Sequence, residues 1–243
     1  AMFHLFTHAF FKALLFLGSG SVIHSFKDEQ DINQMGAVYK KLPYTYIFMI
    51  IGTLALTGFP FLSGFYSKDA IIEFAYLKGN TTGYYAAGIG IFTAVLTSIY
   101  SWRLIFKTFH GEYNNRKIDI NEMHESPLVM LIPLFVLAIG AIFAGFLFKD
   151  LFIGHSEQNV FWGNSIKFLN PLSIEHPPLW FLLTTPILVL ISIPLAYYLF
   201  VKNKDIPNRI VQSNKPLYNF LINKWYFDEL YNVLFIQSSK KIG

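Results

Sequence analysis

The segment MFHLFTHAFFKALLFLGSGSVIH, residues 2–24, decides the fold class because it is long and apolar yet contains ionisable side chains. A transmembrane α-helix needs roughly 20 apolar residues to cross about 30 Å of hydrocarbon, and this segment provides them. His4, His8 and Lys12 recur every fourth residue, so helical geometry aligns them along one stripe, about 6 Å apart per step. The segment is therefore predicted to span a membrane with three ionisable side chains on one face.

Lys12 lies about midway through this apolar run, where a charged side chain is energetically costly. Loss of water disfavours the charged form of a lysine and a nearby acid favours it, so a buried lysine can exchange a proton when its surroundings change. Histidine changes charge close to neutral pH without any tuning. These properties suggest a proton relay through Lys12, His8 and His4. In the structural alternative, Lys12 extends to the membrane interface and the histidines hydrogen-bond to other helices.

The composition of the whole chain indicates the same class of protein. Of its 243 residues, 53% are hydrophobic and only 14% are charged, whereas an ordinary soluble domain has about 25% charged residues. The net charge of +4 does not indicate a nucleic-acid-binding protein, because the basic residues lie between the apolar runs. With no cysteine, the chain cannot form a disulfide, a thiolate metal site or an iron–sulfur cluster. No metal site is expected from the loop histidines either, since ligand spacing is missing at His110, His124, His155 and His176.

Five apolar spans follow from the hydropathy pattern, and together they predict an all-α, polytopic transmembrane bundle. Their approximate ranges are 2–24, 44–78, 84–106, 128–148 and 179–201. The second range is too long for one straight span and contains LTGFPFLSGF at residues 56–65. Pro60 removes a backbone donor and clashes with the preceding turn, so we expect a discontinuous helix with two halves. Broken helices at membrane depth are tolerated where they are buried in protein or line a wet cavity, and in transporters they mark binding sites.

Three ionisable residues follow this break, and position alone leaves their role open. Lys68 and Asp69 come directly after it, and Glu73 lies further along the second half. In one interpretation Lys68 lines a cavity formed by the broken helix and is a second proton site, with which Glu73 could exchange a proton. In the other, the span ends near Tyr66, and Lys68 and Asp69 lie in water at the interface.

The basic loops predict the orientation of the spans, because cytoplasmic or matrix loops carry an excess of Lys and Arg. With five alternating spans, the basic stretches 25–43, 107–127 and 202–243 all fall on one side, which is predicted to be the cytoplasmic or matrix side. Residues 1–203 are predicted to form the membrane module. Residues 204–243, which mix aromatic and charged side chains, are predicted to form an interfacial segment.

Three stretches of this chain carry a family resemblance that covers almost its whole length. Residues 4–24 closely resemble the span of antiporter-like subunits of respiratory complex I that carries their central relay lysine. GFPFLSGFYSKD, at residues 58–69, looks like the broken helix of the same family. NKWYFDELY, at residues 223–231, resembles the segment before the long lateral helix of the L-type, or chain 5, subunit. The resemblance implies that Lys12 is the central relay lysine, that His4 and His8 lead to it, and that Lys68 rather than Glu73 ends the path.

The function implied by this resemblance is that of a proton-translocating membrane subunit of NADH:quinone oxidoreductase. It implies no cofactor in this chain, with NADH, FMN, iron–sulfur clusters and quinone bound by partner subunits. The implied partners are the other membrane-arm subunits and the lipid bilayer of a bacterial plasma membrane or mitochondrial inner membrane. Two alternatives remain: a subunit of a multi-subunit sodium/proton antiporter, which shares both lysine motifs, and a scaffold whose charges only hold helices together. Because the sequence opens inside a span, we expect further spans before Ala1, and a lateral helix and one more span after Gly243.

Overall fold

Four long apolar helices dominate the computed structural model, which describes residues 1–115, 118–153, 161–163, 165 and 177–242. Within those residues, the helices long and apolar enough to cross a membrane are Met2–Ser25, Thr81–His110, Leu128–Ile153 and Leu179–Lys202. They correspond to α1 (Met2–Ser25), α4 (Thr81–Ile105) with the π-helical turn η1 (Phe106–His110), α5 (Leu128–Ile153), and α7 (Leu179–Tyr197) with the π-helical turn η3 (Tyr198–Lys202). The predicted all-α membrane fold is confirmed.

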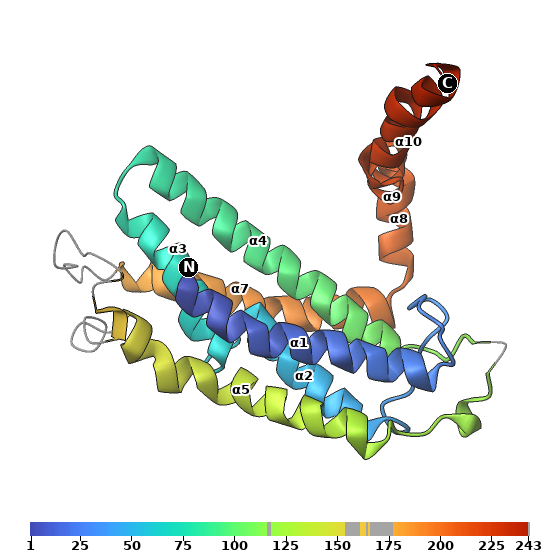
Figure 1. Cartoon of the computed structure of the whole chain (residues 1–243), viewed down its shortest axis with the longest axis horizontal. Helices are drawn as coiled ribbons and strands as arrows, with labels where there is room; N and C mark the ends of the chain where they lie inside the picture. The colour runs from blue at the N-terminus through green and yellow to red at the C-terminus, as the bar shows by residue number, and fades with distance from the viewer. Residues whose placement is uncertain (116–117, 154–160, 164, 166–176, 243) are drawn as a thin grey trace. The chain divides into compact units, whose positions relative to one another are not determined.

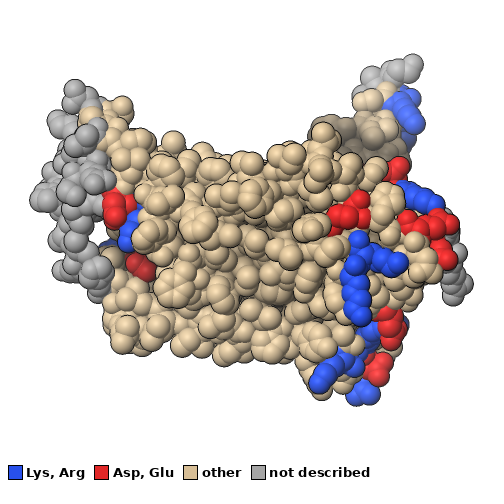
Figure 2. All heavy atoms as spheres, turned by 90° about the horizontal axis from the view of Figure 1, so that it is seen from below, with Lys and Arg blue, Asp and Glu red and all other residues tan. Residues whose placement is uncertain are grey.

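The bundle formed by Ala1–Val201 is one of two compact units of the chain. In it α1 packs against α5 and against α2 (Pro43–Thr57), while α4 packs against α7 (Figure 1). On the face shown in Figure 2, charged side chains gather at the two ends and leave an uncharged band between them. Such a band suits the hydrocarbon layer of a membrane, in which unpaired charges are costly.

The expected second span consists of two helices, α2 and α3 (Ser63–Leu77), and the predicted discontinuity is confirmed. Gly58 ends α2 in the left-handed region with φ of 81°, a conformation that glycine adopts without steric penalty. Phe61 also has a positive φ, of 70°, and such a conformation is strained for a residue with a side chain. The break therefore lies where Gly58 and Pro60 predict it, and α3 continues well beyond Lys68 rather than ending near Tyr66.

The start of α2 is fixed by a carboxylate from the segment that precedes α5. One oxygen of Glu125 accepts hydrogen bonds from the backbone N–H groups of Tyr44, at 2.8 Å, and Thr45, at 3.2 Å. Its other oxygen accepts the Thr45 hydroxyl at 2.6 Å. The first N–H groups of a helix lack intrahelical partners and attract negative charge, so Glu125 caps α2 and ties it to α5.

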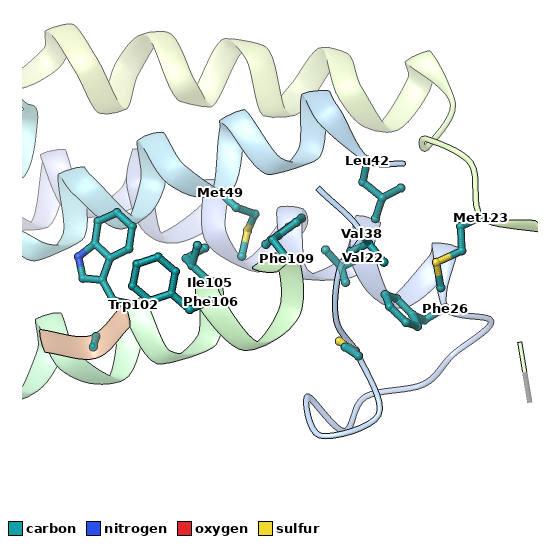
Figure 3. Close-up of a cluster of buried hydrophobic side chains, with 12 residues drawn as sticks. Val22, Phe26, Val38, Leu42, Met49, Trp102, Ile105, Phe106, Phe109 and Met123 are labelled. Carbon is teal, nitrogen blue, oxygen red and sulfur yellow. The ribbon is translucent and has the colours of Figure 1, made fainter. Parts of the chain in front are cut away.

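Close contacts between small and large side chains hold the helices together. Lipid is as apolar as these side chains, so packing and hydrogen bonds, rather than water exclusion, favour association within the membrane. A methyl group at Gly18 of α1 would lie 2.6 Å from the sulfur of Met49 on α2, and one at Gly52 would lie 2.9 Å from Leu15. Met49 belongs to a large apolar cluster at the basic-loop end of the bundle, whose buried members include Phe26, Ile105 and others labelled in Figure 3.

The second compact unit, Lys202–Gly243, consists of short helices. These are α8 (Asp205–Ser213), α9 (Lys215–Ile222), η4 (Lys224–Tyr226), α10 (Phe227–Tyr231), η5 (Asn232–Gln237) and α11 (Ser238–Ile242). Its aromatic side chains are largely exposed, among them Trp225 and Phe227.

Candidate proton path

The predicted site residues lie on two helices that pack against each other, α1 and α3. His4, His8 and Lys12 occupy successive turns of α1, and Lys12 is close to the middle of this 24-residue helix. Lys68, Asp69 and Glu73 lie on α3, within three turns of the break. The structure therefore brings the two groups of residues together, although 56 positions separate Lys12 from Lys68 in the sequence.

Along α1 the ionisable side chains form a continuous row. The rings of His4 and His8 are 5.7 Å apart between centroids. His8 also packs edge-on against Phe11, at 5.3 Å, and the amine of Lys12 lies 5.1 Å from the centre of the Phe16 ring. The His4, His8 and Lys12 side chains are all half-buried within this chain. The aromatic rings around these three side chains limit their contact with water. They do not separate the ionisable groups from one another.

Lys68 and Asp69 border the broken turn. A methyl group placed on Gly58 would lie 3.9 Å from the Lys68 side chain and 4.0 Å from a carboxylate oxygen of Asp69. Asp69 is only 8% exposed, and neither of its carboxylate oxygens accepts a hydrogen bond from any residue that the structure describes. A carboxylate buried in this way interacts strongly with nearby charges, because little water screens it.

Electrostatic interactions connect all six predicted residues in a single line. On α1, Lys12 interacts with His8, and His8 interacts with His4. His4 interacts in turn with Lys68 across the helix interface. On α3 the line continues from Lys68 to Asp69 and from Asp69 to Glu73. A change of charge at either end can therefore affect the protonation of its neighbour, and so on along the line.

Two hydroxyl groups complete the contact between the helices, and no sequence pattern marks them. Ser67 Oγ lies 3.0 Å from Nδ1 of His4 and 2.7 Å from Oγ1 of Thr7. Serine and threonine are common in membrane helices, where they often bond to the preceding turn of their own helix. The contact of Ser67 with the His4 ring and with Thr7 becomes visible only in the structure, where α1 and α3 lie side by side.

The remaining histidines do not form a metal site among the residues described. No group of three or more His, Cys, Asp or Glu side chains in that part of the chain could hold a metal ion. His110 instead bonds to the Tyr46 hydroxyl through Nε2, at 2.8 Å. His155 and His176 lie outside the described residues, as do the loop residues Arg116, Lys117 and Lys167.

The helical bundle, its broken helix and this line of ionisable residues define an all-α membrane protein of the antiporter-like type. Residues 1–97 match the family described as "NADH:quinone oxidoreductase/Mrp antiporter, TM". Residues 100–243, more than half of the chain, match the family described as "NADH dehydrogenase subunit 5 C-terminus". The chain belongs to the NADH dehydrogenase subunit 5 family.

Similar proteins from distant organisms share the same description, NADH-ubiquinone oxidoreductase chain 5. The protein from Phytophthora infestans is 46% identical over 250 residues, which cover 100% of this chain and 37% of that protein. The proteins from Marchantia polymorpha and Arabidopsis thaliana are each 41% identical, again over 100% of this chain and 37% of their own length. The chain thus spans little more than a third of the curated relatives that it matches.

Proposed function

We propose that this chain is part of a proton-translocating membrane subunit of NADH:quinone oxidoreductase and that protons pass along Lys12, His8, His4 and Lys68. The observation that carries the proposal is the row of His4, His8 and Lys12 on α1, in which His4 bonds to Ser67, the neighbour of Lys68 on α3. Asp69 acts as the counter-charge of Lys68, and Glu73 extends the row beyond Asp69 along α3. Homologues named as chains of NADH-ubiquinone oxidoreductase support the assignment to this complex.

The chain itself uses no cofactor in this proposal. NADH, FMN, iron–sulfur clusters and quinone are bound by partner subunits, and the energy of their redox reactions biases the charge of the buried lysines. Moving one charge against the membrane potential requires about 2.3 kcal/mol per 100 mV. The subunit lies in a mitochondrial inner membrane or a bacterial plasma membrane, beside the other membrane-arm subunits.

The two units have different roles in this proposal. Residues 1–203 form the membrane module, and residues 204–243 lie at the membrane surface, where their exposed aromatic side chains suit the headgroup region. The loops 25–43 and 107–127 and the segment 202–243 face the cytoplasm or matrix, as the excess of basic residues indicates.

Substitution of His8 by glutamine tests the proton path. Glutamine keeps a polar side chain but takes up no proton near neutral pH. We expect His8→Gln to lower the rate of NADH-driven proton translocation several-fold while the amount of assembled complex stays unchanged. The measurement is proton uptake into membrane vesicles that contain the complex, with and without sodium.

The other outcomes of this experiment identify the alternatives. Translocation that requires sodium would indicate the antiporter function that the first family's description also names. Normal translocation by fully assembled His8→Gln complex would exclude His8 from the path. Loss of assembly would favour a scaffold.

A further inference from the structure

The two hydroxyl groups of Thr7 and Ser67 meet inside the contact between α1 and α3. Thr7 is fully buried and Ser67 is 1% exposed, and their oxygens lie 2.7 Å apart. Thr7 donates a hydrogen bond to the backbone carbonyl of His4, at 3.2 Å. Ser67 lies 3.0 Å from the ring nitrogen Nδ1 of the same histidine. His4 is thus held at its backbone by one hydroxyl and at its ring by the other.

A hydroxyl suits this position because it can both donate and accept a hydrogen bond. A neutral imidazole offers one donor and one acceptor nitrogen, whereas a charged imidazolium offers two donors. Ser67 can therefore donate to Nδ1 when that nitrogen is unprotonated and accept from it when it carries a proton. In the second case the Ser67 hydrogen can turn to Thr7 Oγ1 or to the Ser63 carbonyl, which lies 3.3 Å away. His4 can thus keep this bond in both of its charge states.

The arrangement also determines which ring nitrogen can exchange a proton. When Nδ1 carries its hydrogen and donates it to Ser67, the imidazole gains or loses its proton at Nε2, which is left for transfer to or from a neighbour. Ser67 directly precedes Lys68 on α3, so a bond to Ser67 also fixes the His4 ring relative to that lysine. Proton transfer is sensitive to geometry, since donor and acceptor must approach to hydrogen-bond distance, directly or through one water.

We propose that Thr7 and Ser67 form a positioning pair that orients His4 toward Lys68 in both charge states of the histidine. The proposal rests on the proposed function and adds two residues that support one member of its path. The hydroxyls do not carry the proton in this account; they hold the residue that does. In the structural alternative, the two hydroxyls only hold α1 and α3 together.

Substitutions at Thr7 distinguish the positioning role from the fastening role, because the branched shape and the hydroxyl group can be changed separately. Thr7→Val keeps the branched shape and loses the hydroxyl, whereas Thr7→Ser keeps the hydroxyl and loses a methyl group. A positioning role predicts that Thr7→Val lowers the rate of NADH-driven proton translocation about fivefold, the effect of one net hydrogen bond. It predicts a rate close to that of the unmodified complex for Thr7→Ser. A fastening role predicts instead that Thr7→Val lowers the amount of assembled complex and leaves the rate per assembled complex unchanged.

Substitutions on α3 provide the matched control. Ser67→Ala is expected to lower translocation about as much as Thr7→Val, because it removes the bond to the His4 ring. Ser63, one turn earlier on α3, also has a buried hydroxyl, which donates to the Gly140 carbonyl at 2.9 Å and accepts from the Gly145 N–H at 2.8 Å. Ser63→Ala removes an equally buried hydroxyl that does not touch His4, so translocation per assembled complex should stay unchanged.

The experiment uses the complete complex in membrane vesicles, with proton uptake normalised to the amount of assembled complex. Normal translocation by Thr7→Val and Ser67→Ala, or loss of assembly in both, would overturn the positioning role. His4→Gln in the same series tests the underlying path. If His4→Gln translocates normally, the proposed path itself fails; if only His4→Gln is impaired, the path stands and the positioning pair fails.

Discussion

Replacement of Lys12 by alanine is expected to lower NADH-driven proton translocation about tenfold or more, because a positioned proton donor or acceptor commonly accelerates transfer by about 10²–10⁴-fold. Lys12 lies midway along α1 and interacts with His8 at the end of the row. Without the amine, a proton must cross the middle of the bundle with water alone as its carrier. The measurement is the initial rate of proton uptake by vesicles, together with the amount of assembled complex.

Arginine at the same position is the informative control. It keeps the positive charge but does not release a proton in proteins, because its pKa exceeds about 12. Lys12→Arg should therefore translocate as poorly as Lys12→Ala while it assembles normally. Recovery of translocation by Lys12→Arg would show that a fixed charge is sufficient and would contradict a relay at this position.

Replacement of Gly64 by alanine is expected to prevent assembly of the subunit or to lower its thermal stability severely. Gly64 lies in the first turn of α3, and a methyl group there would come within 1.8 Å of the Ala55 carbonyl oxygen on α2. That atom belongs to the backbone of a packed helix, so it cannot move aside as a flexible side chain can. Overpacking of a core commonly destabilises by about 1–3 kcal/mol, and a clash with backbone exceeds that range.

Gly88→Ala is the control for Gly64→Ala. Gly88 lies inside α4, and a methyl group there meets no atom within 4 Å among the residues described. Alanine favours a helix interior over glycine by about 1 kcal/mol, so the amount of assembled complex should stay equal or rise. The two variants are compared by the yield and thermal stability of the complex. Equal yields from both would contradict the close approach of α2 and α3.

The fold could be predicted from the sequence because its signals are local. Apolar runs of membrane-spanning length predict the long helices, and Pro60 beside Gly58 predicts the break. The sequence did not reveal that Phe61 also takes a left-handed conformation, since that depends on how α2 and α3 approach each other. Nor did it predict that the Glu125 carboxylate caps α2, because that contact joins residues 80 positions apart.

The candidate site could be predicted only in part, for a similar physical reason. The row of His4, His8 and Lys12 follows from helical periodicity, which the sequence contains directly. The position of His4 beside Lys68 depends on a tertiary contact, so sequence position alone left the role of Lys68 open. The roles of the Thr7 and Ser67 hydroxyls could not be predicted, because their contact with each other joins two different helices.

The most direct test of the central claim is a double-mutant cycle between the two lysines, read as the rate of NADH-driven proton translocation per assembled complex. Lys12→Ala, Lys68→Ala and the double variant are compared with the unmodified complex. Residues that act as one unit have strongly non-additive effects. If Lys12 and Lys68 work in series along one path, the double variant should translocate no more slowly than the slower single variant. If the double variant instead shows the product of the two single reductions, the lysines act independently and the single path is wrong.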